Sequence, residues 1–143
     1  MDSKAILLHL MFPLVGTPYR WGGDDAVGGF DCSGLMIELL KSVGVLPQGF
    51  DATSQGLRQH FPAVSPQDAK FGDLVFFGTS AGGATHVGLY LGSGLMLEAG
   101  GGDATTTTLE RAATQNAFVR VRPVSRRTDK LGYARPAYKD GAA

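Results

Sequence analysis

The sequence is poor in cysteine and histidine, balanced in charge and free of long apolar runs. A single cysteine cannot form an internal disulfide, so the fold has to hold without one. Thirteen basic and thirteen acidic side chains cancel, which leaves no overall field to attract nucleic acid or an anionic membrane surface. The apolar stretch at residues 5–15 is shorter than the ~18 residues that indicate a spanning helix. We therefore expect no nucleic-acid partner and no membrane span.

The apolar stretch near the N-terminus predicts a helix rather than a secretory signal. Asp2 or Ser3 can cap the start of such a helix. No small-residue cleavage site precedes Tyr19 and Trp21, which belong to the motifs that carry the chemistry. We therefore expect the mature domain to begin near Met1 and the chain to be made in the cytoplasm without a signal peptide.

The size and composition of the chain predict one soluble domain. Its 143 residues fit a single core, and 43% hydrophobic with 18% charged residues is typical of a globular protein. We expect a monomeric domain over residues 1–143. Within it, the segment 125–143 is predicted to be a polar C-terminal tail that carries no chemistry.

Hydrophobic periodicity places helices in the first half of the chain and strands in the second. Residues 33–43 present an apolar helical face, and a shorter helix is indicated at 53–61. A glycine-rich loop precedes them at 16–29. Strands are predicted at 74–77, 86–91, 95–99 and 118–122, with a hairpin turn at Gly92-Ser93-Gly94. This order predicts an α+β fold in which N-terminal helices pack on a central antiparallel sheet.

Cys32 lies at the predicted start of the helix over 33–43, between Asp31 and Ser33. Unpaired backbone N–H groups and the helix dipole favour negative charge at such a position, and the thiolate is the nucleophilic form of cysteine. A free cysteine is more often a small buried hydrophobe, but a core cysteine would have apolar neighbours. The polar neighbours favour a nucleophile, and catalysis would explain an unpaired thiol.

A thiolate nucleophile needs a base, and histidine suits this task near neutral pH. His9 lies in the apolar first helix and His60 at a helix end, so both are assigned structural or exposed roles. His86 begins a predicted strand and is the candidate base, although an ordinary surface histidine fits the pattern equally well. Glu98 interrupts the apolar run on the adjacent strand and is the candidate that orients the imidazole. Solvent exposure of Glu98 remains the alternative, with Asp103 as a weaker substitute.

Four segments resemble, in the family's order, the motifs of the NlpC/p60 papain-like peptidases, which cut bacterial cell-wall peptides. They are GTPYRWGG at 16–23, FDCSGL at 30–35, GDLVFF at 72–77 and HVGLYLG at 86–92. The resemblance runs from about residue 16 to residue 99. It implies the papain-like fold, with Cys32 attacking the scissile amide and His86 as its base, and it implies neither a metal nor another cofactor.

The resemblance also implies that Tyr19 lies near the nucleophile and that Asp31 and Ser33 hold the substrate peptide. Each has a structural alternative, because Tyr19 can pack the loop, Asp31 can assist the helix cap and Ser33 can be the N-cap. Asp73 matches the family pattern but is predicted to be a turn residue at a strand start. The family's third catalytic residue is most often a histidine twelve positions after the base, and Glu98 stands there instead. A carboxylate can accept the imidazole N–H and favour its charged form.

The resemblance implies a cysteine endopeptidase that cleaves peptidoglycan stem peptides through a thioester. The expected bond joins γ-D-glutamate to the diamino acid. N-acetylmuramoyl-L-alanine amidase activity, cross-bridge cleavage, acyl transfer to an acceptor other than water and non-catalytic binding to the cell wall on the same fold remain alternatives. Without a signal peptide, we expect delivery to the wall as a phage endolysin or tail protein, or as a toxin of a secretion system.

Overall fold

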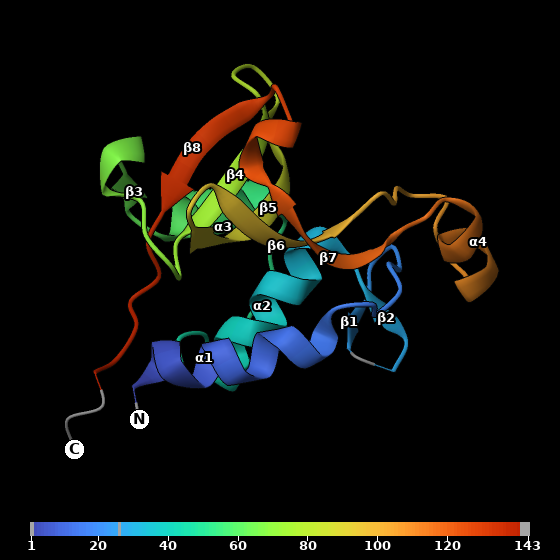
Figure 1. The fold of residues 1–143 in the computed structure, drawn as a ribbon, viewed down its shortest axis with the longest axis horizontal. Coiled ribbons are helices and arrows are strands. Elements are labelled where there is room, and N and C mark those ends of the chain that lie inside the picture. The colour runs from blue at the N-terminus through green and yellow to red at the C-terminus, as the bar shows by residue number, and fades with distance from the viewer. Residues whose placement is uncertain (1, 26, 141–143) are drawn as a thin grey trace.

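The computed structural model describes residues 2–25 and 27–140 and sets α1 and α2 beneath a twisted sheet (Figure 1). The helices are α1 (Ser3–Met11), α2 (Cys32–Ser42), α3 (Ser54–His60) and α4 (Leu109–Thr114), with 3-10 turns η1 (Phe12–Leu14), η2 (Pro66–Asp68) and η3 (Val124–Arg126). The strands are β1 (Asp24–Asp25), β2 (Gly29–Phe30), β3 (Ala63–Val64), β4 (Leu74–Thr79), β5 (Gly83–Gly92), β6 (Leu95–Gly100), β7 (Phe118–Pro123) and β8 (Lys130–Ala134). The α+β class is confirmed.

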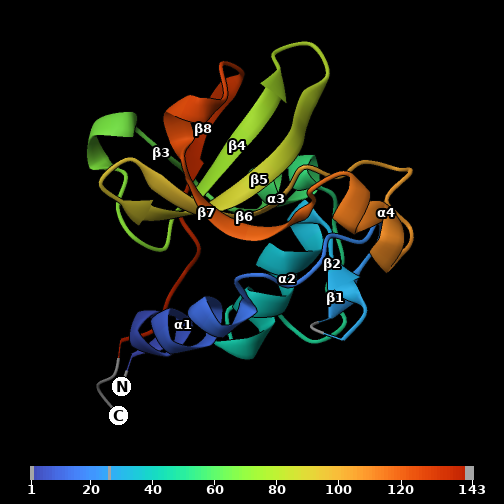
Figure 2. The same ribbon diagram turned by 45° about the vertical axis from the view of Figure 1, so that its right-hand side comes forward.

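The main sheet has the strand order β3-β8-β4-β5-β6-β7, and its neighbouring strands are antiparallel. Side chains alternate between its faces, as the pleat of a strand requires. Leu74 and Phe76 of β4 join the core that the helices share, whereas Val75 and Phe77 join a second cluster on the other face. Helix α2 packs against β5 and β6 (Figure 2). The predicted packing of helices on an antiparallel sheet is therefore confirmed.

The helix starts and the hairpin follow local signals in the sequence. The Asp2 side chain accepts from the Ala5 N–H at 2.8 Å and caps α1, and Thr53 caps α3 in the same way at 3.1 Å from the Gly56 N–H. Ser93, between β5 and β6, has a φ of 54°, which suits the predicted tight turn. The described residues contain no helix with the length and hydropathy to cross a lipid bilayer.

The prediction of a polar C-terminal tail from residue 125 is wrong. This segment completes η3 and then forms β8, which lies inside the sheet between β3 and β4. Arg135, directly after β8, donates to both carboxylate oxygens of Asp73, at 2.9 and 3.0 Å. Asp73 precedes β4 and its side chain is fully buried. An ion pair between a buried carboxylate and a guanidinium that is 34% exposed therefore links the end of β8 to the start of β4, and Asp73 has more than a turn role.

Replacing Arg135 by alanine is expected to lower the free energy of unfolding by about 2 kcal/mol, because the buried Asp73 carboxylate then keeps only the hydrogen bond from the Lys70 N–H. Asp129→Ala is the matched control, since it removes an ion pair whose side chains are 30% and 38% exposed. Such a surface pair contributes less than about 1 kcal/mol. Urea denaturation followed by circular dichroism measures both. Equal stability of Arg135→Ala and the wild type would show that β8 is held by other contacts.

Candidate active site

Cys32 is the first residue of α2, one position earlier in the helix than the sequence predicts. The cause is the N-cap, which is Asp31 and not Ser33. One Asp31 carboxylate oxygen accepts from the Gly34 N–H at 2.7 Å and the other from the Gly22 N–H at 3.0 Å. The carboxylate thereby joins the loop before the helix to the helix start. Cys32 stands where unpaired N–H groups and the helix dipole favour a thiolate.

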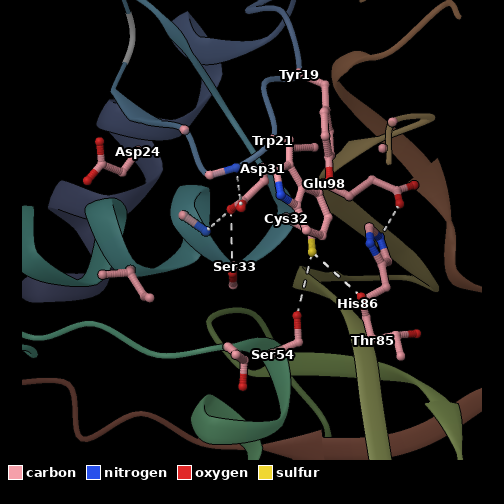
Figure 3. Close-up of a pocket in the computed structure, with 18 of the residues that line it drawn as sticks. Tyr19, Trp21, Asp24, Asp31, Cys32, Ser33, Ser54, Thr85, His86 and Glu98 are labelled. Atoms are coloured by element: carbon pink, nitrogen blue, oxygen red, sulfur yellow. Dashed lines mark hydrogen bonds and ion pairs between the residues drawn. The ribbon is translucent and has the colours of Figure 1, made fainter. Parts of the chain in front are cut away.

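The sulfur of Cys32 has polar neighbours on two sides (Figure 3). It lies 3.5 Å from the hydroxyl oxygen of Ser54 and 3.9 Å from the backbone carbonyl oxygen of Thr85. Burial raises the pKa of the Cys32 thiol, but His86 and the Ser54 hydroxyl outweigh burial and hold that pKa below its ordinary value. The surroundings therefore favour the nucleophilic thiolate.

His86 and Glu98 come together from neighbouring strands of the sheet, β5 and β6. The distance from His86 Nε2 to Glu98 Oε1 is 2.6 Å, and the residues are only 7% and 2% exposed. The imidazole ring lies between the Glu98 carboxylate and the Cys32 sulfur (Figure 3). Gly100 leaves room for this contact, because a Cβ there would lie 3.0 Å from Glu98 Oε1. The structure thus brings together the three residues that the sequence proposes as catalytic.

The charges of these three side chains support one another. Burial alone would lower the pKa of His86, but the contacts with Cys32 and Glu98 raise it to about 9. Burial also opposes the charge on Glu98, yet His86, and more weakly Arg122 and Arg126, hold the Glu98 pKa below its ordinary value. At neutral pH the arrangement therefore favours the charged form of all three side chains: the thiolate of Cys32, the imidazolium of His86 and the carboxylate of Glu98.

The proposed substrate-binding residues surround the same cleft, which has a volume of about 1000 Å³. Tyr19 is only 5% exposed, and burial raises its pKa, as do the negative charges of Cys32, Asp31 and Asp103. Its phenol therefore stays protonated and can donate. The Ser33 hydroxyl lies 3.4 Å from Asp31 Oδ1 and donates to it. Tyr19, Asp31 and Ser33 all line the cleft, and their contacts with a substrate stay predictions.

Two histidines and one acidic residue fall outside the catalytic group. His9 is exposed on α1, and His60 packs its ring against Phe50 and Phe61, with ring centroids 4.8 Å away in each case. Asp103 lines the cleft, but Glu98 holds the histidine. No cluster of three or more metal-binding side chains occurs within residues 2–25 and 27–140.

Sequence reasoning missed Ser54 and the two arginines that line the cleft, Arg126 and Arg127. Ser54 is 5% exposed and stands at the start of α3, where the sequence indicates a helix but no chemistry. The arginines follow β7, in the segment predicted to be a tail. Their basic charge was visible in the sequence, but the return of this segment to the cleft was not.

Ser54→Ala is expected to raise the pKa of the Cys32 thiol by about 1 unit, because it removes a hydrogen-bond donor to the thiolate. The rate of iodoacetamide alkylation as a function of pH measures this pKa. Ser42→Ala, at the far end of α2, is the control and is expected to keep the wild-type profile. An unchanged profile for Ser54→Ala would remove Ser54 from the site.

Comparisons with known proteins identify the family of the chain. The model of the NlpC/P60 family matches residues 16–123. Peptidoglycan endopeptidase RipB of Mycobacterium tuberculosis is 41% identical over an alignment of 112 residues, and the match covers 68% of this chain and 44% of RipB. Murein DD-endopeptidase MepH of Escherichia coli is 32% identical over an alignment of 125 residues, and the match covers 85% of this chain and 46% of MepH. The chain therefore spans less than half the length of these curated relatives.

Solved structures show the same fold. The structure of the peptidoglycan hydrolase RipB from Mycobacterium tuberculosis superposes with a TM-score of 0.74 at 31% identity, covering 96% of this chain and 66% of that one. RipD from Mycobacterium tuberculosis gives a TM-score of 0.72 at 26% identity, covering 96% of this chain and 98% of that one. RipD is described as a non-catalytic NlpC/p60 domain protein adapted to peptidoglycan binding.

Proposed function

The chain belongs to the NlpC/P60 family, and we propose that it is a cysteine peptidase that hydrolyses peptide bonds of peptidoglycan. The observation that carries the proposal is the buried His86 ring, held by Glu98 beside a cysteine at a helix start. The names of the relatives RipB and MepH, both peptidoglycan or murein endopeptidases, support the substrate class. All the proposed catalytic groups come from one chain, so the reaction needs no second copy.

In the proposed reaction the Cys32 thiolate attacks the carbonyl carbon of the scissile amide. The C–S bond forms, the C–N bond breaks, and the His86 imidazolium gives its proton to the departing amine. Water then attacks the thioester carbonyl while neutral His86 takes its proton. The C–S bond breaks, which releases the acid and restores the pair of Cys32 thiolate and His86 imidazolium. The N–H of Cys32, at the first helical position, has no intrahelical acceptor and can stabilise the oxyanion. Such a donor typically contributes about 3 kcal/mol.

The bond that we propose is the one between γ-D-glutamate and the diamino acid of the stem peptide. This choice follows the family resemblance of the four sequence motifs. Cleavage of cross-bridges is the second candidate, because the relative MepH is named a DD-endopeptidase. An amidase that cuts next to muramic acid is the third.

Cys32→Ala is expected to abolish peptide release from purified sacculi, because the nucleophile is gone, whereas Ser42→Ala retains it. Mass spectrometry of the digested muropeptides identifies the bond. A stem that ends in γ-D-glutamate, with a free α-amine on the diamino acid, supports the proposal. Intact stems released from muramic acid indicate an amidase, and separated cross-links with intact stems indicate a DD-endopeptidase. Cleavage by Cys32→Ala at the wild-type rate would show that Cys32 is not the nucleophile.

A non-catalytic peptidoglycan-binding module is the competing function, favoured by the likeness to RipD. An inert thiol is expected of such a module. The lowered pKa of Cys32 favours catalysis instead, because a binding site has no need of a thiolate.

The pH profile of kcat/KM is expected to fall on both sides of a plateau. It falls at low pH as the Cys32 thiolate is protonated, and at high pH as His86, with a pKa of about 9, loses its proton. Glu98→Gln removes the charge that raises the His86 pKa, so the alkaline limb of the profile is expected to shift to lower pH by about 1 pH unit.

Glu110→Gln, exposed on α4, is the control for this shift and leaves both limbs in place. An alkaline limb that stays in place in Glu98→Gln would show that Glu98 does not set the protonation of His86.

A further inference from the structure

The turn η3 brings two adjacent arginines, Arg126 and Arg127, to the wall of the catalytic cleft. They differ in their partners. Arg127 donates to both carboxylate oxygens of Asp129, at 2.9 and 2.8 Å, and its guanidinium lies 5.0 Å from the centre of the Phe77 ring. Arg126 is exposed and forms no ion pair with the part of the chain that the structure describes. Arg126 is therefore the arginine of the cleft wall that is available to a ligand.

Two further arginines lie near Arg126. Arg120 and Arg122 of β7 lie close enough that burial and repulsion by Arg126 lower the pKa of both. The carboxylate that faces these arginines is Glu98, which His86 already engages at 2.6 Å. A bound anion would relieve this repulsion, and a guanidinium favours carboxylates because its planar fork can donate two parallel hydrogen bonds.

The position of Arg126 indicates which part of the substrate it meets. His86 gives its proton to the departing amine, so the amine side of the scissile bond lies along His86 and Glu98. The residue after Arg126, Arg127, holds its guanidinium 5.0 Å from the Phe77 ring, and that ring lies 5.7 Å from the His86 ring. The turn that carries Arg126 therefore meets the cleft on the His86 side. The cleft thus presents a cation to the leaving group.

We propose that Arg126 binds a free carboxylate on the amino acid whose amine is released, and that it makes the enzyme prefer this substrate over the amidated one. The inference rests on the proposed peptidase function and adds a specificity determinant to it. Amidation removes the negative charge and replaces one of the two acceptor oxygens by an NH₂ donor, so the guanidinium can form only one of the two parallel hydrogen bonds. The preference is therefore built into the chemistry of the contact.

Two synthetic peptides test the proposal. Both carry γ-D-glutamate linked to diaminopimelic acid, with the side-chain carboxylate of the diamino acid free in one and amidated in the other. Wild-type kcat/KM is expected to be at least about tenfold higher for the peptide with the free carboxylate, because one charge-assisted hydrogen bond accounts for a difference of about this size. Arg126→Gln is expected to abolish this preference by slowing cleavage of the free-carboxylate peptide alone.

Arg122→Gln is the matched control, because Arg122 also acts on Glu98 but does not line the cleft among the described residues. It is expected to keep the preference. A preference that survives Arg126→Gln would overturn the assignment, because it excludes the contact. Loss of the preference in Arg122→Gln would overturn it as well, because it points to an electrostatic effect on Glu98. Equal cleavage of both peptides by the wild type would overturn it too.

Failure of the proposed peptidase function has a different signature, which is that the wild type cleaves neither peptide. Calorimetry with the Cys32→Ala protein then tests Arg126 by binding alone. The Kd of the free-carboxylate peptide is expected to be about tenfold lower than that of the amidated one. This difference disappears in the Cys32→Ala, Arg126→Gln double variant if the proposal is right, and equal Kd values in Cys32→Ala contradict it.

Discussion

The arrangement of the cleft depends on the contact between His86 and Glu98. Both residues are buried, at 7% and 2% exposure, where an isolated charge would cost several kcal/mol. Their separation of 2.6 Å lets each offset the desolvation of the other. Because this pair keeps the imidazole charged, the thiol of Cys32 gains a counter-ion and its pKa falls. His86 and Glu98, on two neighbouring strands of the sheet, therefore favour the charged form of Cys32, which lies at the start of a helix.

Close backbone packing joins the start of that helix to the loop before it. The Asp31 N–H donates to the Gly23 carbonyl at 3.0 Å, while the Asp31 carboxylate accepts from the Gly22 and Gly34 N–H groups. A Cβ at Gly34 would collide with the Gly23 carbonyl oxygen, so the loop can approach the helix only because no side chain stands there. The loop and the helix start thus form one unit, and Cys32 is held within it.

The three proposed catalytic residues could be predicted because local sequence places each of them. Cys32 follows a helix cap, and the glycine-rich turn between β5 and β6 folds Glu98 back onto His86, twelve positions earlier. Ser54 could not be predicted, since its contact with Cys32 arises only when α3 packs on β5. The strand β8 was missed because it is short and contains a glycine. It pairs with β4, and Arg135 at its end binds Asp73, 62 positions earlier, so both contacts join segments far apart in sequence.

The late position of β8 in the chain has a consequence for biosynthesis. Cys32, His86 and Glu98 leave the ribosome before residues 130–134, yet β4 keeps an unpaired edge until those residues arrive. Pairing between distant segments forms slowly, because the intervening chain must first be ordered. The sheet that carries His86 and Glu98 is therefore complete only when β8 has paired with β4 and β3. Translation itself delays the appearance of a finished cleft.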